Sequence, residues 1–261
     1  MDRNAFQHTR LKIGRARFHI AELEREIAEF MARRPYVCLI SERRVGGQFQ
    51  MQFTTYTREA PPEILPLLLG DVVHNLRVSL DVAANALVAL SNYIPKGVYF
   101  PFGTDEAHFE AQMKDKMKGA SAEAKNLVRA LKPYRGGNDT LRALHDLDIV
   151  DKHSAPLVCE NVVTSPSMTV QGIGTPAGFS LDYSAAGLKP IDQSLFAEPW
   201  HPTDGYKLVG MVDDDKVTHT FCFAKKLPLG GEPAIESLYN LAEAIEGIVQ
   251  TFEAHFFGDQ S

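Results

Sequence analysis

Two short segments place ionisable side chains inside stretches that are otherwise apolar. Burying a charge is costly unless an opposite charge or a hydrogen-bonding partner accompanies it, so such segments mark either a structural ion network or a functional site. We call residues 70–81 the first cluster and residues 141–153 the second cluster. Their polar members are Asp71, His74, Asn75, Arg77 and Asp81 in the first, and His145, Asp148, Asp151, Lys152 and His153 in the second.

Helical geometry brings the polar members of the first cluster together. At about 100° per residue, His74, Arg77 and Asp81 fall on one stripe of a helix, and the apolar residues occupy the opposite side. Arg77 and Asp81 are four residues apart and can form an ion pair. The stripe is either a solvent-facing surface or one wall of a pocket that faces a second polar element.

The second cluster offers that facing element. Its leucines define a buried side, and Asp148 and Asp151 project close to the same side. A carboxylate there needs a cationic or hydrogen-bonding partner, for which Arg77 and His74 are the natural candidates. The sequence therefore predicts that the two clusters face one another.

Three chemistries fit these residue types. A divalent metal would find mixed nitrogen and oxygen ligands in His74, Asp81, His145 and Asp148. Metal-free acid–base catalysis on a phosphodiester would use Arg77 to stabilise negative charge and His74 or His145 to move the proton. The third interpretation is a buried ion network without catalysis. The remaining cluster members would then have supporting roles, namely Asp71, Asn75, Asp151, Lys152 and His153.

Composition bounds the other functions. The 261 residues carry a formal net charge of −6, which argues against a broad nucleic-acid surface but not against a local basic groove. No Gly-x-Ser-x-Gly elbow or phosphate-binding glycine loop occurs, and the three scattered cysteines predict buried free thiols. Residues 1–20 lack the apolar core of a signal peptide, and the longest apolar run is too short to span a bilayer. We expect a cytoplasmic protein without membrane contact.

Hydrophobic periodicity predicts an α+β fold in one domain, residues 1–261, in which a bundle of long amphipathic helices carries an inserted antiparallel β-sheet. Residues 36–56 are expected to form a β-hairpin, and residues 155–226 a β-rich insertion with meander topology. Helices are expected at about residues 4–34, 63–93, 104–118, 120–132, 139–153 and 233–257.

The run from Gly70 to Val82, together with the Asp151-Lys152-His153 sequence, resembles a widespread and largely uncharacterised group of bacterial proteins. The first run is also similar to the HEPN superfamily motif, an arginine followed after four to six residues by histidine. That resemblance implies a helical bundle, often dimeric, which in many members is a metal-free ribonuclease of toxin–antitoxin or phage-defence systems and in others only binds.

Arg77 matches the arginine of the HEPN motif, but Val82 stands where its histidine is expected. Asp148 stands where asparagine is common in the bacterial group, which disfavours a polyanion nearby. We therefore expect a binding or regulatory component with a polar pocket between helices, forming a homodimer through its helices, with RNA or a small molecule as partner. The alternatives are a hydrolase, metal-free or metal-dependent, and an interaction protein with a buried ion network.

Overall fold

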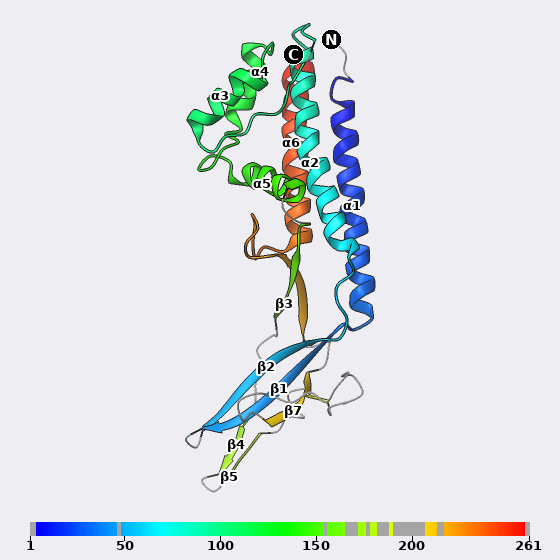
Figure 1. Cartoon of the computed structure of the whole chain (residues 1–261), viewed down its shortest axis with the longest axis vertical. Coiled ribbons are helices and arrows are strands. Elements are labelled where there is room, and N and C mark those ends of the chain that lie inside the picture. The colour runs from blue at the N-terminus through cyan, green and yellow to red at the C-terminus, as the bar shows by residue number, and fades with distance from the viewer. Residues whose placement is uncertain are drawn as a thin grey trace. The chain divides into compact units, whose positions relative to one another are not determined.

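The computed structural model describes residues 4–45, 48–94, 96–153, 156–164, 172–175, 178–181, 188–189, 207–212 and 217–258. The fold is α+β, as predicted. Figure 1 shows the described helices, which are α1 (Gln7–Ala32), α2 (Ile64–Ala89), α3 (Glu106–Lys116), α4 (Ala122–Ala130), α5 (Asp139–His153) and α6 (Ala234–Phe257). The described strands are β1 (Tyr36–Val45), β2 (Gln48–Thr57), β3 (Cys159–Thr164), β4 (Gly172–Thr175), β5 (Gly178–Leu181), β6 (Leu188–Lys189), β7 (Lys207–Val212) and β8 (Thr218–Phe223).

Contacts divide the chain into two compact units. The first comprises Met1–Glu26, Glu63–Glu160 and Cys222–Ser261, and the second comprises Ile27–Pro62 and Asn161–Phe221. The organisation of residues 1–261 as a single domain, which the sequence leads us to expect, stays a prediction.

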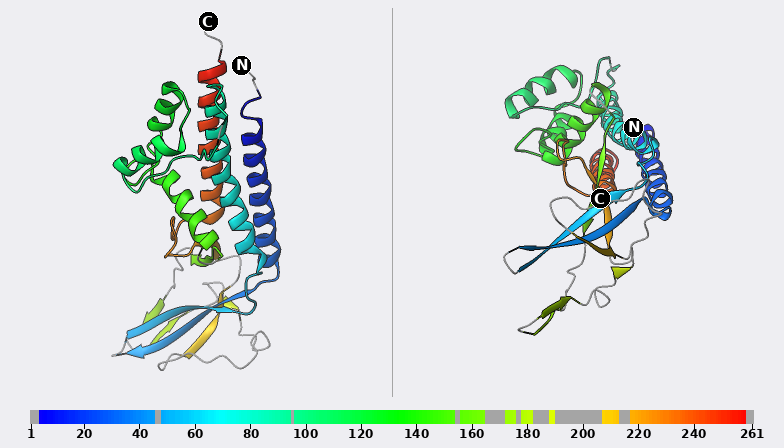
Figure 2. Two further views of the ribbon diagram at one scale, coloured as in Figure 1. Left: turned by 45° about the horizontal axis from the view of Figure 1, so that its top comes forward. Right: turned by 60° about the horizontal axis from the view of Figure 1, so that its bottom comes forward.

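In the first unit, α1, α2 and α6 lie side by side (Figures 1 and 2). The buried residues of α1 recur at alternating steps of three and four, which is the pattern of a helix packed along a partner. Three polar contacts, each one heptad further along α1 and one heptad further back along α6, set these two helices antiparallel. The contacts are Arg10 with Glu253, Arg17 with Glu246, and Glu24 with Tyr239.

Helix α2 forms the centre of this unit. Its apolar side is fully buried, including Val72, Leu76 and Leu80. Periodicity predicts that the helix continues to residue 93, but it ends at Ala89. The reason is local, because Asn92 adopts a φ of 54°, a left-handed conformation that asparagine tolerates and that an α-helix cannot continue through.

Helix α5 has the bounds that the sequence predicts. The side-chain oxygen of Asn138 accepts a hydrogen bond from the backbone nitrogen of Leu141 and so caps the first turn. Leu141, Leu144 and Leu147 are buried, as their spacing predicts. The second cluster is thus carried by a capped helix that contacts both α2 and α6.

The second unit contains a four-stranded sheet with the order β2-β1-β7-β6. Strands β1 and β2 pair antiparallel from Tyr36 opposite Thr57 to Val45 opposite Gln48, where the sequence predicts a hairpin. The predicted meander is wrong, because β7 of the insertion pairs with β1 of the hairpin and β3 pairs with β8. Residues 154–155, 165–171, 176–177, 182–187, 190–206 and 213–216 of the predicted insertion lie outside the described residues.

Two smaller sequence predictions concern the thiols and the membrane. Cys38 and Cys222 are buried and outside any disulfide, as predicted, and Cys159, also outside any disulfide, is half-buried. Among the described residues, none of the helices combines the length and the apolar character needed to cross a bilayer.

Candidate functional site

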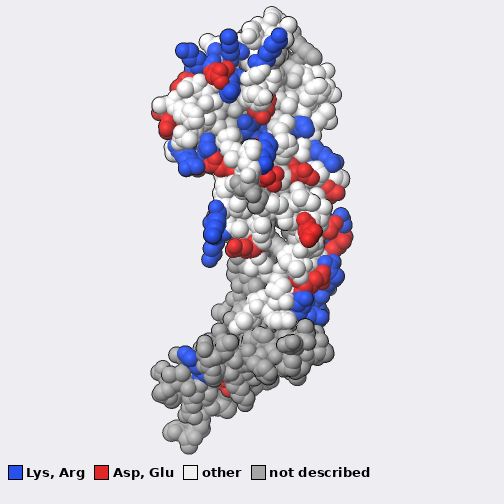
Figure 3. All heavy atoms as spheres, viewed as in Figure 1, with Lys and Arg blue, Asp and Glu red and all other residues white. Residues whose placement is uncertain are grey.

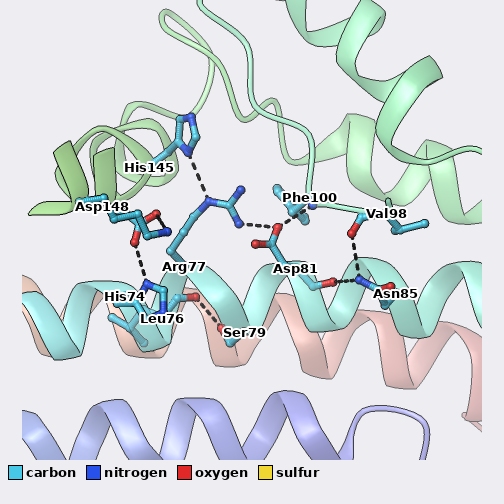
Figure 4. A network of polar contacts seen from close by, with 11 residues as sticks. His74, Leu76, Arg77, Ser79, Asp81, Asn85, Val98, Phe100, His145 and Asp148 are labelled. Carbon is cyan, nitrogen blue, oxygen red and sulfur yellow. Dashed lines mark hydrogen bonds and ion pairs between the residues drawn. The ribbon is translucent and has the colours of Figure 1, made fainter. Parts of the chain in front are cut away.

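The two clusters meet between α2 and α5 within the first unit (Figure 4). The Nδ1 atom of His74 lies 3.1 Å from Oδ1 of Asp148, and Nε of Arg77 donates a hydrogen bond of 3.3 Å to Nδ1 of His145. The candidate residues of the two helices therefore face one another. Of the two predicted partners of Asp148, Arg77 and His74, it is His74 that contacts its carboxylate.

Close approach of α5 to α2 depends on Gly70. A Cβ atom at this position would lie 2.5 Å from Oδ1 of Asp151, well inside van der Waals contact. Glycine is therefore the residue type that lets the Asp151 side chain rest against the α2 backbone. This contact accounts for the glycine that opens the first cluster.

Arg77 stands at the centre of what we call the arginine network, formed by Arg77, Asp81, Phe102 and His145. Its Nη1 atom lies 2.6 Å from Oδ1 of Asp81 as an ion pair, although the angle is not that of a hydrogen bond. Its guanidinium carbon lies 4.6 Å from the centre of the Phe102 ring, in cation–π contact. Only 9% of the Arg77 side chain is exposed, so the network encloses the cation.

The same network fastens residues 98–103 to α2. Asp81 accepts a hydrogen bond from the backbone nitrogen of Phe100, and Asn85 donates one to the carbonyl of Val98. On the opposite side, Arg142 of α5 donates to the carbonyl of Gly103. Segment 98–103 is thus held from both helices, and Phe102 is the side chain that reaches the network.

His145 is a neutral imidazole in this setting. Its ring stacks on Phe102, with centroids 4.4 Å apart and planes inclined by 4°. Burial, together with the nearby charges of Arg77 and Arg142, lowers the pKa of His145 to about 4. Because Nδ1 accepts a hydrogen bond from Arg77, the ring proton resides on Nε2. His145 therefore has no lone pair available to act as a base.

The other part of the interface is what we call the histidine–aspartate site, formed by His74, Asp148 and Lys152. The Asp148 side chain is 6% exposed, and its Oδ2 atom accepts a hydrogen bond of 2.6 Å from Nζ of Lys152. The His74 side chain is 44% exposed. The buried Asp148 carboxylate thus contacts both Lys152 and Nδ1 of His74, while the His74 ring remains partly exposed to solvent.

Carboxylates surround this site. Burial raises the pKa of Asp151 above its ordinary value, and the neighbouring charges of Asp148 and Asp71 raise it further, against the opposing effect of His74 and Lys152. Three carboxylates around one histidine and one lysine give the site a negative balance. The site therefore suits a neutral or cationic ligand better than a polyanion.

The predicted metal set is not assembled. Within the described part of the chain, no group of three or more His, Cys, Asp or Glu side chains is placed to hold a metal ion. Of the four predicted ligands, His74 and Asp148 form one pair, whereas Asp81 and His145 belong to the arginine network on either side of Arg77. Arg77 thus separates two of the predicted ligands from each other.

The remaining predicted residues have local roles. Asn75 donates from its amide to the carbonyl of Asp71 and accepts a hydrogen bond from Lys12 of α1. Lys152 holds Asp148, and His153 is exposed at the end of α5. Sequence reasoning missed Phe102 as a site residue, because an aromatic side chain between two charged clusters carries no sign of what it will stack on.

The distribution of charge on the face drawn in Figure 3 is consistent with a site confined to the interface of α2 and α5. On the described part of the face drawn in Figure 3, positive and negative side chains are interleaved, and neither sign forms a continuous stripe. The described part of this face therefore lacks the continuous positive patch that is typical of broad nucleic-acid binding.

The fold and the site define an α+β protein whose central helix pair carries a histidine–aspartate pair beside an enclosed arginine. A scan against family models and searches of curated proteins and of solved structures found no match.

Proposed function

We propose that the protein is a hydrolase of a small substrate, with His74 as general base and Asp148 as the residue that positions it. The observation that carries this proposal is the 3.1 Å contact between Nδ1 of His74 and the buried carboxylate of Asp148. A base whose ring is oriented by a third group, with its second nitrogen toward solvent, is the arrangement that activates water or a nucleophile.

The proton transfer involves the two ring nitrogens differently. With its proton on Nδ1, directed at Asp148, His74 has a lone pair on Nε2. That lone pair takes a proton from water as the water oxygen attacks the substrate, and the imidazolium that forms is stabilised by the carboxylate. The proton then passes from Nε2 to the leaving group, which restores the neutral ring.

The substrate class follows from charge. Asp71, Asp148 and Asp151 surround His74, while the nearest arginine, Arg77, is enclosed by its own ion pair and ring contacts. Phosphodiester cleavage would require exposed positive charge for the developing anion. A neutral or cationic ester or amide suits the site better than RNA does.

Chromogenic ester hydrolysis tests the proposal. Purified protein should hydrolyse p-nitrophenyl butyrate faster than buffer, and His74→Ala should lower kcat/KM by roughly 10²- to 10⁴-fold. His153→Ala is the matched control, because it removes an exposed histidine at the end of the same helix pair. Equal rates for wild type and His74→Ala would exclude His74 as the base.

The second candidate is the HEPN-like binding or regulatory component, and the enclosure of Arg77 favours it over an active HEPN ribonuclease. On this proposal the protein acts in the bacterial cytoplasm, possesses no nuclease activity and pairs with a second copy through its helices. The exposed Leu11 and Phe18, one heptad apart on α1, support helix-mediated pairing. Sedimentation of the purified protein as a monomer at high concentration would argue against the dimer.

The third candidate is an interaction protein whose polar cluster is purely structural. The burial of Arg77 supports a structural role for the arginine network. The half-exposed His74 gives no such support, because a partly exposed imidazole does not require a buried partner. If structured RNA is left intact by the wild type, the ester assay gives no activity above buffer and the protein sediments as a monomer, this structural interpretation is the one that remains.

A further inference from the structure

Helix α1 carries what we call the outer stripe, whose members recur at steps of four, three and four residues and are Leu11, Arg15, Phe18 and Glu22. This spacing puts them on one face of the helix, opposite the buried Ile20. Figures 1 and 2 show α1 at the edge of the first unit. Leu11 is 63% exposed and Phe18 is 51% exposed. Two large apolar side chains one heptad apart on an outer face are typical of a helix that packs along another helix.

Gly14 lies beside the stripe, between Leu11 and Phe18. A Cβ atom at this position would have nothing within 4 Å, so no neighbour within the chain requires a glycine here. Glycine in the interior of a helix weakens it. A helix without a side chain at this point, however, lets a second helix approach closely, because the side chains at a helix crossing set the distance between the axes.

The charges along α1 are divided between its two halves. Residues 7–18 contain four Lys or Arg and no Asp or Glu, whereas residues 19–30 contain four Glu and one Arg. On the outer stripe the basic member is Arg15, which lies over the Phe18 ring, and the acidic member is Glu22. Two copies of this helix packed in parallel would bring like charges level with each other. Packed antiparallel, they bring the basic half of each copy level with the acidic half of the other.

The N-terminus of α1 fits the same orientation. The first turn of the helix contains no acidic residue, although negative charge there is stabilising. When two antiparallel copies bring Leu11 of one level with Phe18 of the other, Glu22 comes level with residue 7, at the start of the second copy's helix. Each copy thus supplies the negative charge that the other lacks.

We propose that α1 packs antiparallel against α1 of a second copy of this chain, with the two-fold axis near Gly14 and Leu11 of each copy on Phe18 of the other. Two-fold symmetry makes both the apolar and the charged contacts reciprocal. This inference rests on the pairing that belongs to the second candidate function, and it specifies the surface and the orientation. One helix pair buries less surface than a standard interface, so the association is weak and depends on concentration.

Sedimentation velocity of the full chain over about a thousandfold range of concentration tests the surface. We expect a monomer–dimer equilibrium in the wild type. Phe18→Glu should raise the dimer Kd by at least about 100-fold, because each dimer buries two copies of the ring. Tyr99→Glu is the matched control, since Tyr99 is an aromatic residue of similar exposure, 53%, and should leave the Kd unchanged. Circular dichroism verifies that both variants are folded.

The outcomes separate this inference from the second candidate function. A wild type that stays monomeric overturns both the α1 pairing and the dimer of that candidate. A wild-type dimer that Phe18→Glu leaves intact, or that Tyr99→Glu disrupts equally, overturns the α1 pairing alone.

Cysteine cross-linking tests the orientation. Gly14→Cys places two thiols on either side of the proposed axis, where oxidation with copper phenanthroline should give a covalent dimer above the wild-type background. His8→Cys should not cross-link, because antiparallel packing separates the two copies of residue 8 by about 20 Å along the helices. Cross-linking through His8→Cys and not through Gly14→Cys would show parallel packing and overturn the proposal.

Discussion

The arginine network and the histidine–aspartate site lie beside each other on the same helix pair, yet they differ in what they leave accessible. Arg77 is 9% exposed and contacts Asp81, Phe102 and His145, whereas His74 is 44% exposed and is held by Asp148. The arginine network uses its charged side chains to hold segment 98–103 against α2. The second keeps a titratable ring in contact with water. The two sites contain similar residue types, but the enclosed arginine network has a supporting role, whereas the solvent-accessible histidine–aspartate site could perform chemistry.

Removing Arg77 should have the largest effect. Arg77→Ala leaves Asp81 without its cation, and Phe102 and His145 without their charged neighbour. We expect a loss of about 3–5 kcal/mol in the free energy of unfolding, as for other broken buried pairs. Urea denaturation measures this change. The control, Arg25→Ala, breaks an exposed pair with Glu26 and should cost under about 1 kcal/mol. Similar losses for both variants would mean that the network is not structural.

The pH dependence of stability should identify His145. Its folded-state pKa of about 4 lies below the ordinary 6.5, so the unfolded chain binds more protons between these values. The stabilisation that neutral His145 contributes to the free energy of unfolding is fully present above about pH 6.5 and is lost as the pH falls toward 4. We expect this loss to be about 2 kcal/mol after allowance for partial exposure of the ring. His145→Gln should flatten that part of the stability curve measured by urea denaturation. An unchanged slope would contradict the assignment.

A methyl group at Gly70 should have a smaller effect. Gly70→Ala places a Cβ atom against the Asp151 carboxylate, which can move aside only in part. We expect a net loss of about 1 kcal/mol by thermal or urea unfolding. Gly247→Ala on α6 meets no atom within 4 Å and should instead stabilise by about 0.5–1 kcal/mol. A gain at both positions would show that α5 does not approach α2 as closely as described.

Asp151→Asn should have the smallest effect and the opposite sign. Burial and the neighbouring Asp148 and Asp71 raise the pKa of Asp151, so its charged form is disfavoured in the folded chain. An uncharged amide of similar size relieves that repulsion, and we expect a gain of under about 1 kcal/mol at pH 7. At a pH where the unfolded carboxyl is also protonated, the gain should vanish. A loss at pH 7 would mean that Asp151 serves mainly as a partner of Lys152 or His74.

Sequence patterns predict the elements and the central pairing of this molecule better than they predict its chemistry. The leucine spacing of residues 139–153 fixes which side of α5 is buried, and that side carries Asp148 to His74. Two results depend on tertiary contacts that no local pattern encodes. One is the stacking of Phe102 on His145, and the other is the pairing of β7 with β1 in place of a meander.

Sequence patterns also do not predict which of the two histidines, His74 or His145, has a ring nitrogen available as a base. Either His74 or His145 could be the base as far as residue type and spacing indicate. Only the neighbours decide between them, since Arg77 occupies Nδ1 of His145 while Asp148 takes Nδ1 of His74. The difference between a supporting and a working histidine therefore lies in which side of the ring is occupied and by what.

Nitrogen-15 NMR of the histidine side chains tests most directly whether Asp148 orients His74 as a base. In the neutral ring we expect His74 to carry its proton on Nδ1 and a lone pair on Nε2, and we expect Asp148→Asn to weaken this preference. A His74 ring protonated on Nε2 in the wild type, or a tautomer unaffected by Asp148→Asn, would show that Asp148 does not orient His74 as a base.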